Sequence, residues 1–376
     1  MRKRFLVSLG ALTAEIAVLS LAAASVAGQT PTAGVKATAS AANPPPLARE
    51  TRASFGEVKA LAPPKPAEPA KRGWTPPRTA WGDPDLQGTW PGTAMMGVPL
   101  ERPAQLGEKR FLTDEEFAAR ASGAGRGGGA GRVGGAGAGT GPPGHWGEQG
   151  QPQRQTSLIV DPPNGKMPPM TPEGQKRTAA IPATLYYDNG PGGPFNGPED
   201  LSVYDRCITR GVIGSMVPVG YNAGNQIVQG PGYVALRNEM IHETRVIPLD
   251  GRPHVSSVIR QYMGDSRGRW EGNTLVVETS NFNGKTGVGA NGRAIYHSDA
   301  LHLLERFTRT SADTIRYEAT IDDPTMWTRP WTITFPLTLD PGYGMFEYAC
   351  HEGNYGLRNI LSASRADEKA AADEAR

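Results

Sequence analysis

The chain has 376 residues, and its 39 Lys and Arg side chains nearly balance 37 Asp and Glu, for a formal net charge of +2. Glycine (48) and proline (34) together make up roughly a fifth of the residues, against a usual share of about an eighth. This composition argues against a helical bundle and favours strands, turns and loops. With only 38% hydrophobic residues, the chain can bury one good core, but part of it is expected to be disordered.

The N-terminus has the features of an export signal. Three basic residues (2–4) precede an apolar stretch (5–24), and the small residues Ser25 and Ala27 follow where signal peptidase cuts. The alternative is an uncleaved membrane anchor. Cleavage leaves a net charge near zero, which gives nucleic-acid binding no support, and no later apolar run approaches the roughly 20 residues of a transmembrane helix. We therefore expect a periplasmic or secreted protein with no nucleic-acid partner and no transmembrane segment after cleavage.

Composition also divides the rest of the chain. The Pro- and Ala-rich stretch after the signal cannot bury enough apolar area to offset its chain entropy. The expected organisation is a signal peptide (1–27), a disordered tether (28–73), a single β-rich domain (74–365) with a flexible Gly-rich insertion (122–144), and a charged tail that is disordered or helical (366–376).

Beyond Gln155, apolar and polar residues alternate with a period of two, which predicts many short strands. The expected strands are 157–160, 225–228, 233–237, 240–247, 257–263, 274–279, 301–309, 314–321, 331–337 and 345–351. We expect a mainly β fold, an antiparallel meander closed into a barrel or, alternatively, a two-sheet β-sandwich. Long loops and one short helix, which begins near Thr113 with Glu116 three residues on, complete the expected fold.

Charged residues stand in the apolar rows of several expected strands. Glu305 shares a face with Leu301, Leu303 and Phe307. The other members of this group are Glu243 and Arg245 beside Ile241 and Ile247, Arg260 beside Tyr262, and Glu278 beside Val276. If these rows face inward, each ion must find a partner or a ligand, because an unpaired buried charge costs several kcal/mol. The two interpretations are structural ion pairs and a pocket for a polar ligand.

Five of the six histidines lie between residues 242 and 351, namely His242, His254, His297, His302 and His351. Imidazoles with a carboxylate are the ligands of a zinc site, so metal binding stays open. No local spacing such as H-E-x-x-H is present, and the residues name no cofactor. The alternative for each histidine is a hydrogen bond at the rim of the β-structure.

The run Gly264-Asp265-Ser266-Arg267-Gly268 fits the G-x-S-x-G pattern of serine hydrolases. That pattern needs a strand before the serine and a helix after it. Here a strand-like run follows, so we expect a hairpin linker. Serine catalysis, with His242 or His254 as base, is the alternative.

Cys207 and Cys350 are the only cysteines. In an oxidising compartment an even pair favours a disulfide, and the alternative is two free thiols, of which Cys350 beside His351 could be reactive. Arg329 stands between Trp327 and Trp331, where it could form a stacked anion clamp or pack over surface tryptophans.

Several longer motifs resemble a family of exported proteins of environmental bacteria for which no activity is established. The motifs are residues 81–90, 157–177, 199–211, 240–254, 264–282, 322–332 and 348–361, and the match runs from about 81 to 365 outside the glycine tract. The resemblance implies export and a common fold. Separately, DLQGTW (85–90) is similar to the first strand of lipocalin-like barrels, which implies that the expected barrel is an enlarged version of that fold.

Three functions follow as hypotheses. The first is an exported barrel that binds a small polar or amphipathic ligand in an interior pocket lined by Glu, Arg, His and Tyr. Its expected ligand-binding residues are Arg245, His254, Arg260, Tyr262, Glu278 and Arg329. The second is a hydrolase or lyase in the same pocket, metal-assisted or not, with Glu243, Glu305, His242 and His302 as catalytic acids and bases. The third is a cell-envelope or carbohydrate-contacting module that uses exposed Trp81, Trp90, Trp327 and Trp331. The oligomeric state is left open.

Overall fold

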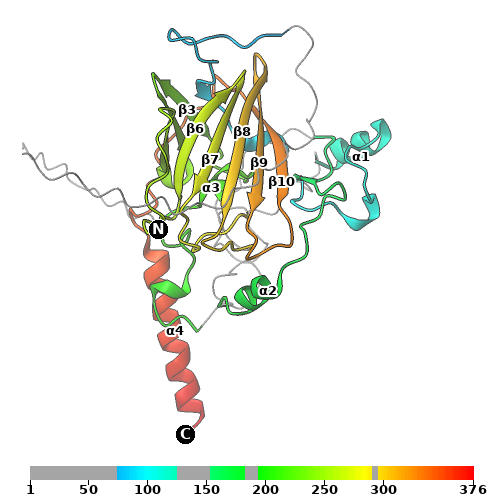
Figure 1. The fold of residues 1–376 in the computed structure, drawn as a ribbon. Helices are drawn as coiled ribbons and strands as arrows, with labels where there is room; N and C mark the ends of the chain where they lie inside the picture. Colours follow the sequence, from blue (N-terminus) through cyan, green and yellow to red (C-terminus); the bar gives the residue numbers. More distant parts are fainter. Residues whose placement is uncertain (1–73, 125–152, 183–193, 290–294) are drawn as a thin grey trace, which may run out of the picture. The chain divides into compact units, whose positions relative to one another are not determined.

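The computed structural model describes residues 74–124, 153–182, 194–289 and 295–376 (Figure 1). All of them belong to the second of two compact units, residues 62–376. The expected signal peptide and tether lie outside the described residues, as does most of the expected Gly-rich insertion. No helix in the described part of the chain is long and apolar enough to cross a membrane.

Two antiparallel sheets dominate the described chain. The larger has six strands in the order β2-β10-β9-β8-β7-β6, and the smaller has four in the order β1-β3-β4-β5 (Figure 1). The strands of the larger sheet are β2 (Ile159–Asp161), β6 (Asp265–Glu271), β7 (Thr274–Ser280), β8 (His302–Ser311), β9 (Thr314–Asp322) and β10 (Trp331–Thr338). Those of the smaller sheet are β1 (Gly88–Thr89), β3 (Asn225–Gly230), β4 (Tyr233–Asn238) and β5 (Thr244–Pro248).

The mainly β prediction is confirmed, but the predicted barrel is not found. Among the described strands, the ladders give two separate sheets and no closed ring. Both sheets contribute to one hydrophobic core, which joins Ile227, Leu236 and Ile247 of the smaller sheet to Leu303 and Phe335 of the larger. This arrangement fits the two-sheet alternative, in which the inner faces of two sheets bury each other.

The inner face of β8 in the larger sheet carries two charged residues in its buried row, Glu305 and Arg309. Along β8, residues 303, 305, 307 and 309 are buried and the residues between them are less so. Glu305 therefore points into the core, opposite Val277 on β7 and Ala319 on β9. The expectation of an inward acid in this strand is correct.

Gly268, on β6, lets the smaller sheet come close to the edge of the larger one. A Cβ atom on Gly268 would lie 2.6 Å from Leu249 Cδ2 and 2.8 Å from Ile247 Cγ2. Arg245 of β5 also reaches β6, where Nη1 lies 3.4 Å from Ser266 Oγ. The missing side chain at Gly268 thus sets the approach of the strand that carries Arg245.

The helices are few and lie around the sheets. They are α1 (Asp114–Ala124), α2 (Pro172–Ala179), α3 (Val212–Met216) and α4 (Tyr355–Glu374), with short 3-10 helices at Gly92–Met95, Ala104–Leu106, Pro198–Asp200 and Met240–His242. At α1, Thr113 Oγ1 accepts from the Glu116 backbone N–H, and Glu116 accepts from that of Thr113, so the predicted capping pair is present. Helix α4 runs across the expected boundary at residue 365.

Three predicted strands differ from the observed structure. Residues 257–263 and 345–351 form turns and irregular chain, and β6 occupies 265–271 instead. The predicted strand 240–247 begins with a 3-10 turn because Ile241 (φ 62°) and His242 (φ 47°) are both in the left-handed region. For a β-branched residue such as Ile241 this conformation is strained, so the surrounding contacts must hold it.

Candidate functional site

A buried ion pair lies between the two sheets. Arg245 donates from Nη1 to Glu305 Oε2 (2.5 Å) and from Nη2 to Glu305 Oε1 (2.9 Å), and the Tyr317 hydroxyl also donates to Oε1 (3.0 Å). The Arg245 and Glu305 side chains are 6% and 0% exposed. Burial alone would lower the pKa of Arg245, but the Glu305 carboxylate raises it above its usual value. Arg245 therefore stays charged in the core.

One donor of this pair remains unused. Arg245 Nε is buried and has no hydrogen-bond partner among the described residues. Buried polar groups in native proteins are nearly always satisfied, so an unsatisfied donor in a residue that lines a cavity is an exception that calls for an explanation.

Arg245 lines a cavity of about 570 Å³, which we call the Glu243 pocket. Its walls come from the start of β5, the loop before β6 and the start of β6. The lining residues are Glu243, Thr244, Arg245, Val246, Arg260, Gln261, Tyr262, Met263, Gly264, Asp265, Ser266 and Asn283. Four residues that the sequence singled out, Glu243, Arg245, Arg260 and Tyr262, are thus brought together.

Glu243 is the acid best placed to titrate in this pocket. Burial raises the pKa of its carboxyl, while a hydrogen bond from Thr209 Oγ1 to Oε2 (2.5 Å) and the nearby Arg245 charge oppose that effect. Because the pKa is raised in the folded state, the folded protein holds this proton to higher pH than the unfolded chain does. Among the acids that line this pocket, Glu243 is the one whose carboxyl pKa is raised by burial.

This raised pKa predicts a pH dependence of stability. Its contribution is fully present below the ordinary glutamate pKa and is lost as pH rises through the raised value, because the unfolded state then binds fewer protons than the folded state. We expect wild type to lose stability relative to Glu243→Gln across this interval. Urea unfolding of both proteins at a series of pH values measures the difference, and parallel profiles would contradict the assignment.

Ion pairs at the rim of the pocket fix its shape. Asp265 accepts from His254 Nδ1 (2.8 Å) and from Arg267 Nη1 (2.7 Å). Arg260, in the loop before β6, forms a second ion pair, in which its Nη1 lies 2.5 Å from Asp299 Oδ2. His254 does not line the pocket itself but contacts a carboxylate that does.

Other predicted site residues lie away from the Glu243 pocket. Glu278 is on the outer face of the larger sheet, 37% exposed and bound by Arg269 Nη1 (2.7 Å). His302 is on that same outer face, opposite Asp322. Glu305 lies behind Arg245 and is not among the lining residues. Strand alternation turns Glu278 and His302 outward, and the salt bridge with Arg245 occupies Glu305, so the structure does not bring these ligand-binding and catalytic candidates into the Glu243 pocket.

The predicted anion clamp at Arg329 is absent. Arg329 is exposed and donates from Nη2 to both oxygens of Asp161 at 2.9 Å. Trp327 and Trp331 are 2% and 0% exposed, and their rings meet edge to face at 5.5 Å. Trp90 is also fully buried, so only Trp81, at 38% exposure, presents the surface that the carbohydrate-contacting hypothesis required.

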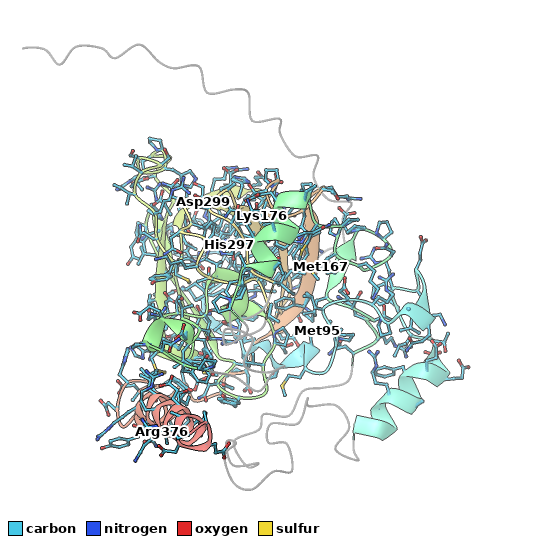
Figure 2. The ribbon with its side chains drawn as sticks, turned by 90° about the horizontal axis from the view of Figure 1, so that it is seen from below. Met95, Met167, Lys176, His297, Asp299 and Arg376 are labelled. Carbon is cyan, nitrogen blue, oxygen red and sulfur yellow. A yellow bond between two sulfur atoms is a disulfide. The ribbon has the colours of Figure 1, made fainter. Side chains whose placement is uncertain are left out.

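The histidines are dispersed. His242 is exposed and donates from Nδ1 to the carbonyl oxygen of Tyr348 (2.9 Å). His297, next to the end of α2 in Figure 2, is buried with both nitrogens bonded, to Thr286 Oγ1 (2.7 Å) and the Ser298 carbonyl (2.8 Å). Burial lowers its pKa, which keeps it neutral. In the described ranges no three His, Cys, Asp or Glu side chains are grouped so as to hold a metal ion.

The surroundings of Ser266 are those of a residue within a sheet and not those of a catalytic serine. It lies within β6, its Oγ is 2.9 Å from Thr279 Oγ1, and β7 rather than a helix follows. The glycines of the motif have packing reasons, since Gly264 (φ 63°) lies against β7 and Gly268 faces β5. The described chain shows no nucleophile elbow here, and the expected hairpin linker is in fact the start of a strand.

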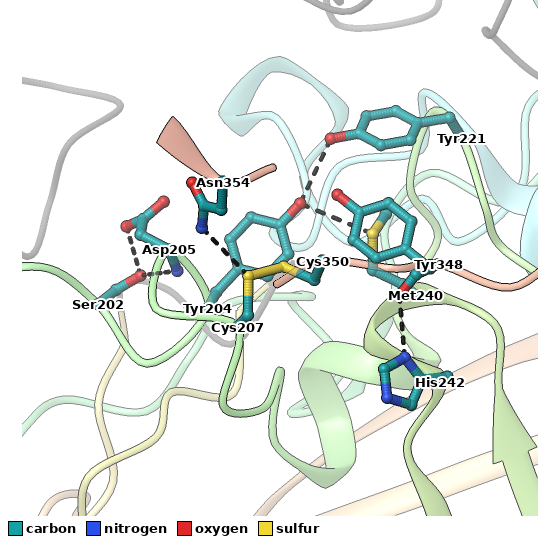
Figure 3. Close-up of a disulfide and its surroundings, with 10 residues drawn as sticks. All are labelled: Ser202, Tyr204, Asp205, Cys207, Tyr221, Met240, His242, Tyr348, Cys350 and Asn354. Carbon is teal, nitrogen blue, oxygen red and sulfur yellow. Dashed lines mark hydrogen bonds between the residues drawn. A yellow bond between two sulfur atoms is a disulfide. The ribbon is translucent and has the colours of Figure 1, made fainter. Parts of the chain in front are cut away.

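The predicted cysteine pair is confirmed. Cys207 and Cys350 form a disulfide with their Cα atoms 5.6 Å apart (Figure 3). The bond joins the turn before α3 to the irregular segment that follows β10. Asn354 Nδ2 donates to Cys207 Sγ at 3.4 Å.

Around the disulfide lies a larger cavity of about 1010 Å³, which we call the tyrosine cavity. Sequence reasoning did not find it. It is lined by Tyr204, Asp205, Cys207, Asn222, Glu239, Asp340, Gly342, Tyr343, Gly344, Phe346, Glu347, Tyr348, Ala349, Cys350 and Asn354. Tyr343 and Tyr348 come from one aromatic-rich segment, which could have indicated them, whereas Tyr204 comes from a distant part of the chain.

Glu239 anchors one wall of the tyrosine cavity and is 1% exposed. Its Oε1 accepts from Asn222 Nδ2 (3.1 Å) and the Phe346 N–H (3.2 Å). Its Oε2 accepts from the Gly224 N–H (3.2 Å) and the Tyr343 hydroxyl (2.7 Å). This fully bonded carboxylate has a structural role.

A search for similar proteins finds no match to this chain among family models, curated proteins or solved structures.

Proposed function

We propose that the protein is an exported binding protein for a small polar ligand, which it holds in the Glu243 pocket. The observation that carries the proposal is the buried Arg245 guanidinium at the pocket wall, whose Nε lacks a hydrogen-bond partner in the described chain. Glu305 fixes the orientation of that guanidinium, so Nε is a preorganised donor.

The chemistry of the lining supports a polar, hydrogen-bonding ligand. The two arginines of the pocket are each paired with an acid, and Asp265 is paired with His254 and Arg267, so the walls carry little unbalanced charge. Thr244, Gln261, Tyr262 and Asn283 add neutral donors and acceptors. A ligand with several hydroxyl or carbonyl oxygens satisfies such a site better than a strongly charged one.

The cysteine pair supports the proposed location outside the cytoplasm. Disulfides persist in the periplasm and in secreted proteins and are rare where thiols are kept reduced. The basic and apolar N-terminal segment supports the same location.

Binding is tested by thermal-shift screening of the purified mature protein against sugars, aromatic acids and lipids. For a compound that binds, Tyr262→Phe and Glu243→Gln are expected to weaken binding roughly three- to tenfold each, the effect of one lost hydrogen bond. The matched control is Tyr233→Phe, which removes the hydroxyl of a 43% exposed tyrosine outside the pocket. If all three variants bind the compound with equal affinity, the compound does not bind in the Glu243 pocket.

A second candidate function is acid–base catalysis in the same pocket. It is favoured by Glu243, whose pKa burial raises, together with the His254–Asp265 pair at the rim. Turnover of a bound compound, lost in both Glu243→Gln and His254→Gln, would establish it. Binding without product would leave the binding function alone.

A further inference from the structure

Arg210 is a buried charge that no acid neutralises. Its side chain is 1% exposed, and both Nε and Nη2 are buried without a hydrogen-bond partner among the described residues. Burial lowers its pKa to about 10, so it is still protonated at neutral pH. An isolated ion in the interior costs several kcal/mol, so this position needs an explanation.

Two other buried arginines show how such a charge is normally satisfied. Arg102, also 1% exposed, donates to Thr156 Oγ1 (2.9 Å) and to the Pro163 carbonyl (2.6 Å). Arg245 makes its bidentate pair with Glu305. Within the described part of the chain, Arg210 has neither kind of partner.

Three tyrosines set the electrostatic environment of Arg210, namely Tyr204, Tyr221 and Tyr348. The hydroxyl of Tyr204 lies 3.3 Å from that of Tyr221 and 3.7 Å from Met240 Sδ, and Figure 3 shows the Tyr204 ring beside the disulfide. Burial raises the pKa of Tyr204 and of Tyr348, so both stay neutral. Neutral hydroxyls donate hydrogen bonds but do not cancel the Arg210 charge.

The tyrosine cluster faces a cavity that can admit a ligand. Tyr204 and Tyr348 both line the tyrosine cavity, with Phe346 and Tyr343 near them. Arg210 does not line the cavity itself, but its positive charge interacts electrostatically with two hydroxyl-bearing residues of the cavity wall, Tyr204 and Tyr348. In the low dielectric of the interior, that charge acts over this distance more strongly than it would in water.

We propose that the tyrosine cavity is a second binding site, which recognises the carboxylate of a small aromatic acid through the Tyr204 and Tyr348 hydroxyls in the field of Arg210. The carboxylate supplies the negative charge that Arg210 lacks, and phenolic hydroxyls are suitable donors to it. The aromatic body packs against Phe346 and the tyrosine rings.

The acids of the cavity restrict the rest of the ligand. Asp205, Glu239, Asp340 and Glu347 also line it. A second negative group on the ligand would be repelled, so the remainder of the molecule is uncharged or positive. The recognised class is therefore a monocarboxylate on an aromatic body.

The test uses benzoate and its neutral analogue benzamide on the mature, oxidised protein. Benzoate is expected to raise the thermal unfolding midpoint in proportion to the logarithm of its concentration above the Kd, whereas benzamide and sodium chloride at equal ionic strength leave it unchanged. Tyr348→Phe is expected to weaken benzoate binding about tenfold, as for the loss of one hydrogen bond to a charged group.

Arg210→Met gives the sharpest contrast. Because Arg210 has no partner to lose, the variant is expected to unfold at a higher temperature than wild type and to lose its response to benzoate. Arg102→Met is the matched control, which is expected to unfold at a lower temperature and to keep the response. A lower midpoint for Arg210→Met, or a benzoate response that persists in it, would overturn the proposal. So would an absence of any benzoate shift in wild type, whereas the Glu243 pocket variants leave this result untouched.

Discussion

Replacing Glu305 with glutamine is expected to lower the free energy of unfolding by about 3–5 kcal/mol, because it leaves the Arg245 charge buried without a counterion. The isosteric change keeps the volume of the side chain at 0% exposure, so cavity formation does not contribute. Urea unfolding at neutral pH measures the loss. A change below about 1 kcal/mol would mean that water or another group compensates Arg245.

The double variant Arg245→Met/Glu305→Gln separates the cost of an orphaned charge from the net value of the pair. Replacing both ions of a buried pair by groups of similar volume is often nearly neutral, so most of the lost stability should return. The double variant still lacks the Nε donor and should not bind the ligand of the Glu243 pocket. A double variant that is as stable as wild type but does not bind the ligand would show that the Arg245–Glu305 pair serves binding rather than stability.

Removing the disulfide has the second large expected effect. The bond between Cys207 and Cys350 closes a loop with a sequence separation of 143 residues. On the chain-entropy model, its loss in Cys207→Ser/Cys350→Ser lowers the free energy of unfolding by about 4–5 kcal/mol. Guanidinium unfolding of the variant and of the oxidised wild type measures the difference.

The reductant provides the control for that experiment. Dithiothreitol should bring wild type close to the serine variant and leave the variant itself unchanged. If wild type unfolds at the same denaturant concentration with and without reductant, the disulfide does not stabilise the folded state.

The alternation of apolar and polar residues along the sequence predicted the features that depend on a single strand. Glu305 stands in an apolar row of β8, and the row faces the core as expected. The same reasoning failed for Glu278, because alternation does not say which face of β7 is inside. The buried Val276 next to it on the outer face shows that apolar neighbours alone do not identify the core side.

The partners of the charged groups could not be predicted from the sequence. Arg245 and Glu305 are in different sheets and 60 residues apart, so their pairing depends on how the sheets pack. The irregular segments 257–263 and 345–351 have apolar and polar alternation like a strand, but their backbones pair with no ladder. The residues of the Glu243 pocket were therefore predicted to lie on strands, whereas many of them lie in the loop before β6.

Arg210 was missed for a related reason. It stands at the start of a stretch, residues 211–236, that contains no charged side chain. The absence of charged residues after Arg210 was a usable signal, although Asp205 lies five residues before it. Of the three tyrosines around it, Tyr204 and Tyr221 lie on either side of it in the same segment, and the fold brings only Tyr348 from a distant part of the chain.

The segment after β10 has no helix or strand between residues 339 and 354. Its shape is imposed by attachments to other parts of the molecule, which are the Glu239 carboxylate, the His242 ring and the bond to Cys207. A segment without secondary structure of its own keeps its conformation only while the elements that carry these attachments are folded. One side of the tyrosine cavity therefore depends on these attachments, and we expect it to be the first part of the cavity to loosen when they weaken.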